Sequence, residues 1–494
     1  MLASDPRWRD HRVVAHLAEH VLPRFGADVA DPVEIMELSP STPSQPTCFP
    51  RCMRFSELSG ARVCVWGLGR EIRSLAAQLP RLPGARITTA VVEDSADDVA
   101  TTLGGEVRLV RPEEAVRAAQ ACDVLVRSPG VPVGRPELAE IRALGVPVTT
   151  ATSLWLAERG GRNVIGVTGT NGKSTTATIL HHLLAAAGHQ VRLAGNIGTP
   201  ALDLLAEADA DWCVVELSSY QIADLAVGPH HAVVTNMFRD HLSWHGGEAA
   251  YRRDKLRLLG LPGVRTCTLP ADLTVEGCDL PTLRFGGSDG WHPGDGVVEH
   301  PDGRRHPIVD FALRGRHNAL NLCAALTAAD AAGLTLPSSL GSALRGIAAP
   351  PHRLQSIGRH GGVDWIDDSI STTVESAIAA LEAFPDRPVL LIAGGFDRGL
   401  DYTALGRAIA DRDVVVIGVG TTGPRIIEAA RLAGTPPDHL LRADDLAHAV
   451  SMARAHAVPD GVVLLSPAAP SFDAYPDFEA RGDHFTALAR ADTG

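Results

Sequence analysis

The chain has 494 residues, of which 45% are apolar and 21% are charged, and its formal net charge is −13. This length is too great for one core and predicts about three domains of roughly 150 residues each. The negative charge argues against a general binder of nucleic acid or of anionic membranes, so any phosphate must be held by a local site. No run of about 18 apolar residues is present and the first residues lack the apolar core of a signal peptide, which predicts a cytoplasmic protein.

Residues 1–52 differ in composition from the rest of the chain. One helix is predicted over residues 8–25, and the stretch SPSTPSQPTCFP after it favours disorder. Met53 directly precedes the first recognisable segment, so translation that starts at Met53 is an open alternative. The eight cysteines are scattered through apolar segments, which indicates reduced thiols, and the one close pair, Cys48 and Cys52, supplies too few ligands for zinc.

Short, nearly continuous apolar runs recur along the chain and end in Gly, Pro, Ser or Asn. Helical patterns such as residues 174–188 alternate with them, which is typical of parallel α/β sheets covered on both faces. Residues 264–310 break the alternation and predict a small antiparallel insertion, while Pro- and Gly-rich stretches near residues 150 and 350 predict domain boundaries. The predicted strands are 62–67, 163–169, 211–217, 231–236, 388–395, 413–420 and 461–467.

The segment GVTGTNGKST, residues 166–175, runs from an apolar strand directly into a helix. A glycine-rich turn there presents backbone N–H groups at a helix N-terminus, which suits a triphosphate, while Lys173 adds a charge and Ser174 a metal-facing hydroxyl. Five residues separate Gly166 from Gly172, where the usual P-loop has four. The predicted nucleotide contacts here are Gly169, Thr170, Asn171, Gly172, Lys173, Ser174 and Thr175.

Two further strands carry polar residues at their ends. Glu216 ends the strand 211–217, and Asp240 and His241 follow the strand 231–236. Parallel α/β folds collect ligands at strand C-termini, and Mg²⁺ takes few protein ligands, so Glu216 and His241 are predicted to bind metal. His245, a little further on, is expected to be a loop residue without a role.

The segment RVCVWGLGREIR, residues 62–73, predicts a strand, a turn at Gly67 and Gly69, and a helix. The third glycine of a dinucleotide-binding motif is missing, because Ile72 occupies its place. NAD binding is therefore an alternative that the motif supports poorly.

Taken together, the motifs resemble those of the Mur ligases of peptidoglycan synthesis, and within them the MurD type, over about residues 53–490. The resemblance implies that ATP phosphorylates the carboxylate of UDP-N-acetylmuramoyl-L-alanine and that the amine of glutamate attacks the acyl phosphate. The motifs, in family order, are GVTGTNGKST, GNIG (195–198), ELSSYQ (216–221), TNMFRDHLSWHG (235–246), YRRDK (251–255), GRHNALN (315–321), PHR (351–353), DDS (367–369) and SPAAPSFDAYPDFEARGDHF (466–485).

The resemblance also implies roles for individual residues. Lys173 is expected to contact the transferring phosphoryl group, and Lys255 aligns with a lysine that the family carbamylates to hold a second Mg²⁺. Asn196 resembles a contact to the muramoyl-alanine. The catalytic set is Lys173, Glu216, His241 and Lys255; the metal set is Ser174, Glu216, His241 and Lys255; and the further ATP contacts are Asn318, Asn321, Arg353 and Asp368.

The resemblance assigns three domains after residues 1–52. A Rossmann-like domain, 53–150, is expected to bind the UDP part of the substrate through Gly67, Leu68, Gly69 and Ser128, with the uracil contacts unassigned. A central P-loop ATPase domain, 151–350, combines a parallel sheet with the small antiparallel insertion. A second Rossmann-like domain, 351–494, is expected to hold the glutamate, and the residues that match there are Thr372, Arg398, Ser471 and Phe478.

The glutamate side departs from the MurD type at two places. Arg398 stands where that type has lysine, and the stretch WIDDSISTT (365–373) has Ile370 where that type has lysine in approximately Asp-Ser-Lys-Ala-Thr-Asn. Two changes around one small substrate indicate altered recognition and favour the branch that adds L-glutamate, with a separate epimerase acting on the product.

Three alternatives to L-glutamate ligation are open. The first is ligation of D-glutamate. The second is a ligase like folylpolyglutamate synthase, which lacks the N-terminal UDP-binding domain. The third is a non-catalytic relative, which would have lost the P-loop lysine or the metal ligands, whereas Lys173, Glu216, His241 and Lys255 are all present.

Overall fold

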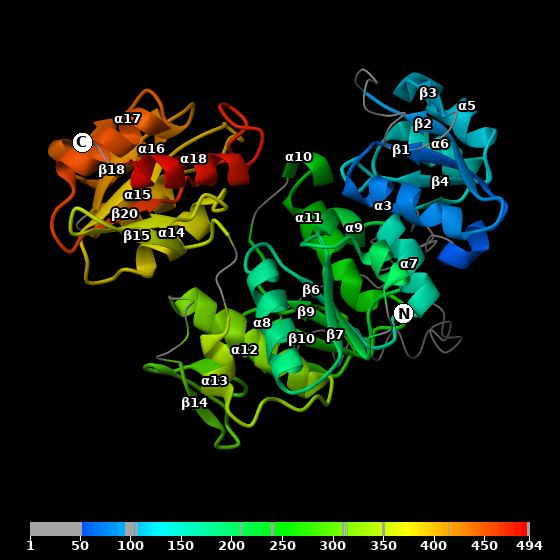
Figure 1. The fold of residues 1–494 in the computed structure, drawn as a ribbon, viewed down its shortest axis with the longest axis horizontal. Helices are drawn as coiled ribbons and strands as arrows, with labels where there is room; N and C mark the ends of the chain where they lie inside the picture. Colours follow the sequence, from blue (N-terminus) through cyan, green and yellow to red (C-terminus); the bar gives the residue numbers. More distant parts are fainter. Residues whose placement is uncertain are drawn as a thin grey trace, which may run out of the picture. The chain divides into compact units, whose positions relative to one another are not determined.

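The computed structural model describes residues 52–491 except 94–102, 104–106, 208–209, 239–241, 309–310, 312, 314, 348–350 and 413. The predictions for residues 1–51, including the helix 8–25, lie outside the described residues, as do Asp240 and His241. All of the described residues belong to the unit Pro50–Gly494, and Figure 1 labels its helices and strands.

The first sheet has five parallel strands in the order β3-β2-β1-β4-β5. Alternate residues of β1 and β4 face opposite sides: Val63 and Val65 pack with α3 and α7, while Cys64 and Trp66 pack with α5 and α6. The strands are β1 (Arg62–Trp66), β2 (Arg86–Val91), β3 (Arg108–Val110), β4 (Val124–Arg127) and β5 (Val148–Thr149), and the helices are α3 (Arg70–Gln78), α5 (Ala115–Gln120), α6 (Pro136–Ala143) and α7 (Ala151–Arg159).

The second sheet has six parallel strands in the order β11-β10-β9-β6-β8-β7. Its strands are β6 (Val164–Thr168), β7 (Val191–Gly195), β8 (Trp212–Glu216), β9 (His231–Val234), β10 (Thr266–Pro270) and β11 (Thr282–Phe285). The helices are α8 (Lys173–Ala186), α9 (Ser219–Ile222), α10 (Leu242–His245), α11 (Glu248–Leu256), α12 (Arg316–Ala331) and α13 (Leu340–Arg345), and the 3₁₀-helix η6 spans Ala201–Ala206.

One face of this second sheet shares a core with the first sheet. Val164 and Val215 pack in the same apolar cluster as Val63 and Trp155, whereas Ile165 and its neighbours face the separate core formed with α8 and α12. The shared cluster runs from Phe55 to Leu273 in the sequence. Separation of the two sheets would therefore expose apolar area that is now buried.

The predicted antiparallel insertion over residues 264–310 is partly wrong. Strands β10 and β11 pair in parallel and extend the second sheet, and only β12 (His292–Pro293), β13 (Val297–Glu299) and β14 (Arg305–Pro307) form an antiparallel sheet. Short strands separated by turns have the same sequence pattern in both arrangements, because pairing direction depends on where the connecting chain returns.

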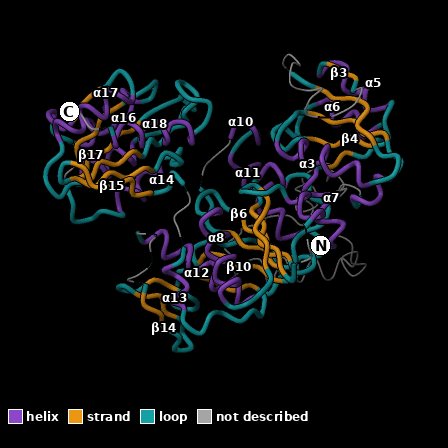
Figure 2. Tube along the Cα trace, viewed as in Figure 1, coloured by secondary structure: helices purple, strands orange, loops and turns teal. Residues whose placement is uncertain are grey.

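The third sheet has the order β15-β16-β20-β17-β18-β19, parallel except for the β15–β16 pair. Helices α14, α15 and α16 cover one face and α17 and α18 the other. Figure 2 marks α14, α16, α17 and α18 in purple around the orange strands of this sheet. The strands are β15 (Gln355–His360), β16 (Val363–Asp367), β17 (Val389–Ala393), β18 (Val414–Gly418), β19 (Leu440–Arg442) and β20 (Val462–Leu465), and the helices are α14 (Val374–Glu382), α15 (Thr403–Ala410), α16 (Gly423–Ala433), α17 (Leu446–His456) and α18 (Phe478–Arg490).

All seven predicted strands are present within one or two residues of their predicted limits, as is the helix after the P-loop. The seven described cysteines are free thiols, as predicted. The strands could be predicted because each is buried on both faces and therefore has an almost unbroken apolar run.

Asp330 on α12 fastens the antiparallel sheet to the second sheet. Its carboxylate accepts hydrogen bonds from the indole of Trp291, at 2.8 Å, and from two nitrogens of Arg304, each at 2.9 Å. Trp291 is almost fully buried, so its N–H depends on this partner.

We expect Asp330→Ala to lower the free energy of unfolding by about 1–2 kcal/mol, because it leaves the buried Trp291 N–H without an acceptor. Urea denaturation measures this loss. Asp302→Ala is the matched control: Asp302 also pairs with Arg304 but is about half exposed, so its loss should lower the free energy of unfolding less than the loss of Asp330. Equal losses in the two variants would contradict the assigned role.

Candidate active site

The P-loop turn between β6 and α8 has the shape that the sequence predicts. Gly169 and Gly172 have φ angles of 148° and 78°, and a Cβ at either position would overlap the side chain of Thr235 or Asn321. Gly172 caps α8, a helix of 14 residues, so the N–H groups of the first turn of α8 are available to an anion.

Two residues that the sequence analysis missed hold this turn from the end of β9. The hydroxyl of Thr235 and the amide of Asn236 donate to the carbonyl of Asn171 at 2.6 and 3.0 Å, and the Asn171 N–H donates back to Asn236 at 2.9 Å. Both residues stand in the quoted motif TNMFRDHLSWHG, in which His241 is the predicted site residue.

Glu216 lies at the C-terminal end of β8 with only 1% of its surface exposed. Its carboxylate accepts hydrogen bonds from the Ser174 hydroxyl at 2.7 Å and from the Asn196 side-chain amide at 2.9 Å. Three residues predicted for metal and substrate thus meet at the carboxyl ends of β6, β7 and β8. The hydroxyl and carboxylate oxygens together are hard ligands of the kind that Mg²⁺ takes, so these residues fit a magnesium ion.

Lys255 on α11 lies against the same turn. It is 2% exposed, and its ammonium donates to the carbonyl of Gly169 at 2.7 Å. Tyr251, one helical turn earlier, shares a hydrogen bond of 2.7 Å with the hydroxyl of Thr170. The helix therefore places its lysine against the P-loop turn.

The metal set is only partly described, because His241 lies outside the described residues. Within the described part of the chain, no three His, Cys, Asp or Glu side chains form a group that could hold a metal. The predicted ligands Ser174 and Lys255 are not of these residue types, so the metal prediction stands as a prediction.

His245 is not the roleless loop residue that the sequence analysis expected. Its ring is fully buried. One ring nitrogen lies 2.7 Å from the Asp254 carboxylate and the other 3.0 Å from the Ser219 hydroxyl. A single histidine in a loop gives no signal of such contacts in the sequence, because both partners are distant along the chain.

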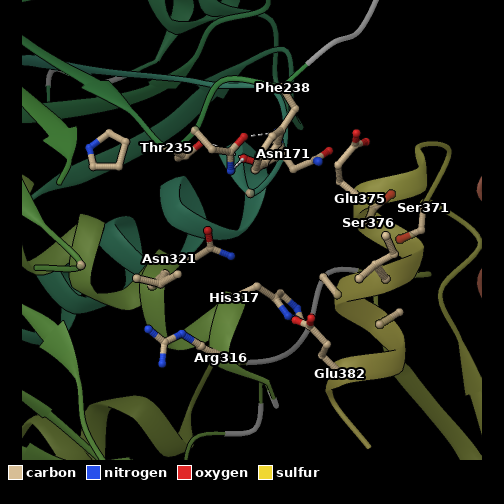
Figure 3. A pocket seen from close by; sticks show the side chains of 18 of the residues that line it. Asn171, Thr235, Phe238, Arg316, His317, Asn321, Ser371, Glu375, Ser376 and Glu382 are labelled. Carbon is tan, nitrogen blue, oxygen red and sulfur yellow. Dashed lines mark hydrogen bonds between the residues drawn. The ribbon is translucent and has the colours of Figure 1, made fainter. Parts of the chain in front are cut away.

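A cavity of about 540 Å³ adjoins the P-loop (Figure 3). In Figure 3 the side chains of Arg316, His317 and Asn321 on α12 face those of Glu375 and Glu382 on α14 across this cavity. Five predicted ATP contacts line it, namely Asn171, Gly172, Asn321, Arg353 and Asp368, and so do Thr235, Asn236, Phe238, Arg316, His317 and Glu375, which were not predicted.

The remaining predicted ATP contacts do not line this cavity. Asn318 is buried and accepts a hydrogen bond of 3.1 Å from the Asn321 side chain, so it orients that residue. Lys173 donates to the carbonyl of Thr170 at 2.6 Å, and Thr175 is buried within α8. Arg316 and His317 could have been found, because they stand in the quoted motif GRHNALN.

Burial changes the ionisation of two groups at the cavity. Burial lowers the pKa of His317 to about 4, and the charge of Arg353 adds to the effect, so this imidazole is neutral near pH 7. Burial likewise lowers the pKa of Arg353, while Asp368 and Glu216 oppose the change. The Nε of Arg353 is buried and has no hydrogen-bond partner among the residues that the structure describes, which fits a site for a polar ligand.

Asp367 and Asp368 end β16 and have different surroundings. Asp367 lies 2.8 Å from the ring of His352 and accepts the Ser369 N–H at 3.0 Å, so it shapes the loop. Asp368 is 2% exposed and accepts hydrogen bonds from the Ser466 hydroxyl and the Leu354 N–H. Burial raises the pKa of Asp368 to about 6, and hydrogen bonds from Ser371 and Ser466 limit the rise.

The predicted glutamate residues lie at the carboxyl ends of the third sheet and do not line the 540 Å³ cavity. Ser471 is 1% exposed, and its hydroxyl has no hydrogen-bond partner in the described structure. Phe478 begins α18 and lies edge-on to His352, Thr372 precedes α14, and Arg398 is exposed after β17. A buried hydroxyl without a partner is uncommon and fits a ligand site.

The predicted UDP residues meet at a second cavity, of about 410 Å³. Gly67, Leu68 and Ser128 line it together with Trp66, Glu93 and Gly130. A Cβ on Gly69 would come 2.8 Å from the Ser128 hydroxyl, so glycine permits the close approach of the two loops. Ile72, at the position of the missing third glycine, is a fully buried core residue.

Models of two protein families match the chain: the Mur ligase middle domain over residues 167–272 and the Mur ligase glutamate ligase domain over residues 352–469. A Micromonospora protein named UDP-N-acetylmuramoyl-L-alanine–L-glutamate ligase is 41% identical over 456 residues, which cover 90% of this chain and 99% of the relative. A Xanthomonas euvesicatoria protein of the same name is 40% identical and covers 89% of this chain and 97% of the relative. The chain belongs to the Mur ligase family.

Solved structures of Mur ligases share the fold at lower identity. The UDP-N-acetylmuramate–alanine ligase MurC of Thermotoga maritima is 17% identical, with a TM-score of 0.55, over 86% of this chain and 98% of that one. The MurF ligase of the same organism, in complex with ADP, is 18% identical, with a TM-score of 0.55, over 89% and 97%. The mixed α/β fold with parallel sheets is thereby shown. No helix in the described part of this Mur ligase is both long and apolar enough to span a membrane.

The raised pKa of Asp368 predicts a pH-dependent stability. Because its folded-state pKa lies above its unfolded-state value, its contribution to stability is complete below about pH 4 and is lost as the pH rises through about 6. We expect Asp368→Asn to gain about 2–3 kcal/mol of unfolding free energy, relative to wild type, between about pH 4 and pH 7.5. Denaturant unfolding at both pH values measures this, with the exposed Asp386→Asn as control. A difference independent of pH would contradict it.

Proposed function

We propose that this Mur ligase joins L-glutamate to UDP-N-acetylmuramoyl-L-alanine at the expense of ATP, in the synthesis of peptidoglycan precursors. The relatives that carry this name are about 40% identical over nearly their whole length. The observation in the structure that carries the proposal is the buried Glu216 carboxylate with Ser174 and Asn196 as its donors, directly beside the P-loop. The cytoplasmic location stays a prediction.

The three large, mainly parallel sheets correspond to three domains in this proposal. Residues 53–150 bind the UDP part of the substrate, 151–350 form the P-loop ATPase domain, and 351–494 bind glutamate. The first has the strand order of a Rossmann fold, and the last is a mainly parallel sheet with helices on both faces but a different strand order. Ligands in such folds bind at the carboxyl ends of the strands, which is where the 410 Å³ cavity and Ser471 lie.

The reaction needs activation because a free carboxylate is a poor electrophile. A carboxylate oxygen attacks the γ-phosphorus of ATP and ADP leaves; the glutamate amine then attacks the acyl carbon, phosphate leaves, and the amine loses a proton as the amide forms. The P-loop N–H groups and Lys173 would hold the phosphates, and Asn196 the acceptor substrate. Asn321, Arg353 and Asp368 would bind the nucleoside part of ATP in the 540 Å³ cavity.

Ser174, Glu216 and His241 would hold one Mg²⁺, and a carbamylated Lys255 a second. Bound there, the ions neutralise the charge of the phosphates as the phosphoryl group transfers. Carbamylation needs the neutral amine of Lys255, and what supports the proposal is the position of this buried side chain, whose Nζ lies 2.7 Å from the Gly169 carbonyl of the P-loop turn.

L-glutamate is preferred over D-glutamate because of the changes around its site. Ile370 is half-buried in the loop after β16, between Ser369, which Arg481 holds, and Ser371, whose N–H donates to the Asp368 carbonyl. The side chain that the MurD type uses as a cation is therefore aliphatic in this loop. A separate epimerase would act on the product. A ligase like folylpolyglutamate synthase is disfavoured, because residues 53–150 form a further sheet with its own cavity.

We expect phosphate release that requires ATP, Mg²⁺ and UDP-N-acetylmuramoyl-L-alanine and that is faster with L-glutamate than with D-glutamate. Purified full-length protein assayed with each enantiomer measures the preference. Glu216→Gln, which removes one charge and keeps the shape, should lower kcat at least about a hundredfold. Faster turnover with D-glutamate would overturn the choice of enantiomer, and activity without the UDP-linked substrate would overturn the whole assignment.

We expect Ile370→Lys to weaken the use of L-glutamate more than the binding of ATP. The new ammonium would place a cation beside the L-glutamate site, where the wild-type loop has an aliphatic side chain. Therefore kcat/KM for L-glutamate should fall about tenfold, equal to about 1.4 kcal/mol, while KM for ATP changes by about twofold or less. Ile427→Lys, at another half-buried isoleucine of the third sheet's helices, is the matched control. Equal effects on both substrates would contradict the assignment of Ile370 to the glutamate side.

A further inference from the structure

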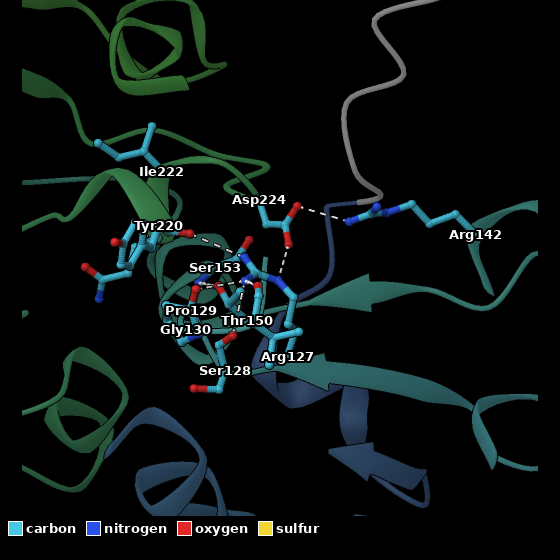
Figure 4. A network of polar contacts seen from close by, with 12 residues as sticks. Arg127, Ser128, Pro129, Gly130, Arg142, Thr150, Ser153, Tyr220, Ile222 and Asp224 are labelled. Atoms are coloured by element: carbon cyan, nitrogen blue, oxygen red, sulfur yellow. Dashed lines mark hydrogen bonds and ion pairs between the residues drawn. The ribbon is translucent and has the colours of Figure 1, made fainter. Parts of the chain in front are cut away.

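The loop after β4, residues 128–131, has every one of its carbonyl groups held by a side chain. The guanidinium of Arg127 donates to the carbonyls of Ser128 and Pro129, at 3.1 and 3.0 Å, and to that of Val131 (Figure 4). The indole of Trp244 donates to the carbonyl of Gly130 at 3.2 Å. Ser128, Gly130 and Val131 line the 410 Å³ cavity.

Arg127 is itself fixed in place. Its side chain is completely buried and pairs with Asp224 at 2.7 Å, and the same carboxylate pairs with Arg142 at 3.1 Å. Figure 4 shows Asp224 between the two arginines. Moving Arg127 would break its pair with the buried Asp224 carboxylate and leave that carboxylate with only the partly exposed Arg142, which is costly. This side of the loop is therefore rigid.

Trp244 approaches the loop from a different part of the chain. It belongs to α10, and its indole stacks on Tyr220 of α9, with ring centroids 4.3 Å apart and an angle of 26° between the planes. The carbonyl of Tyr220 accepts a hydrogen bond of 3.3 Å from Arg127. The two side chains that hold the loop are thus connected through one residue.

His245, the next residue after Trp244, connects α10 to the lysine-bearing helix. Its buried ring bridges Asp254 and Ser219 at 2.7 and 3.0 Å. Asp254 directly precedes Lys255 on α11, and Ser219 begins α9 just after Glu216. Neighbouring side chains of α10 therefore contact the loop at the 410 Å³ cavity and the helix that carries Lys255.

We propose that Trp244 is a positioning residue for the UDP-linked substrate, which holds loop 128–131 in register with the helix that carries Lys255. The inference rests on the proposed function for the identity of that substrate. A loop held in its binding geometry before the ligand arrives loses less conformational freedom on binding. Release of the Gly130 carbonyl should therefore weaken binding of that substrate and leave binding of the others unchanged.

The test is Trp244→Phe in the full chain, because phenylalanine keeps a ring for stacking and loses the N–H donor. We expect the Kd of UDP-N-acetylmuramoyl-L-alanine, measured calorimetrically without ATP, and its KM in turnover each to rise about three- to tenfold, as loss of one hydrogen bond implies. KM for ATP and for L-glutamate should change about twofold or less.

Trp291→Phe is the matched control. It likewise removes an indole hydrogen bond, here that of the buried Trp291 to Asp330 at 2.8 Å beside the antiparallel sheet, so it should lower the melting temperature without weakening binding of the UDP-linked substrate. Arg127→Lys is a second variant that should weaken binding of the UDP-linked substrate. A lysine ammonium cannot donate to three carbonyls and Asp224 with the geometry of a guanidinium. If Trp244→Phe does not fold, the same Kd and KM measurements on Arg127→Lys test whether release of loop 128–131 weakens binding of the UDP-linked substrate.

The outcomes separate the two proposals. If wild type does not bind the UDP-linked substrate, the proposed function fails. If wild type binds it and Trp244→Phe binds it equally well, only the role of Trp244 fails. An equal rise in the KM of all three substrates would also overturn that role, because a general loss of structure has no preference for one substrate.

Discussion

The burial of the Glu216 carboxylate is the constraint on which the centre of this molecule depends. A carboxylate with 1% of its surface exposed must have its oxygens satisfied by donors, since water cannot reach them. The donors come from the P-loop, through Ser174, and from the end of β7, through Asn196. Three strand ends are thereby held in one arrangement, and Lys255 meets the same turn from a fourth direction. The polar centre is rigid before any ligand is present.

At the third sheet, the buried cation Arg481 joins two loops in the way that the buried Glu216 carboxylate joins strand ends of the second sheet. Arg481 is 4% exposed and holds the loop after β16 by donating to the hydroxyl and the carbonyl of Ser369, and it reaches the loop after β20 through the carbonyl of Ala469. Burial lowers the pKa of Arg481 to about 10, so it remains charged near pH 7. The two loops that carry Asp368 and Ser471 are therefore joined by one cation.

The two apolar cores of the second sheet explain why the polar contacts stay in register. One core is shared with the first sheet and the other is formed with α8 and α12. The strands cannot slide without moving apolar side chains out of both cores, so the strand ends that carry Glu216, Asn196 and Thr235 keep their relative positions. Apolar packing thus fixes where the strand ends lie, and the hydrogen bonds there require polar side chains such as Glu216, Asn196 and Thr235.

The sequence by itself determined the α/β class, the buried strands and the glycine-rich turn before α8, because each depends on an uninterrupted apolar run or on a motif of neighbouring residues. The roles it predicts for Ser174, Glu216 and Asn196 stay predictions, and the structure brings these three side chains together. It also predicted Asp368 as a nucleotide contact through its motif, and this residue lines the 540 Å³ cavity. It could not determine the pairing of β10 and β11, because parallel and antiparallel strands of that length have the same local pattern. Nor could it find the contacts of Thr235, Asn236 and His245, whose partners lie far away in sequence or have no motif. Only the tertiary structure decided these, since a hydrogen bond between distant segments exists only after the cores have placed both of them.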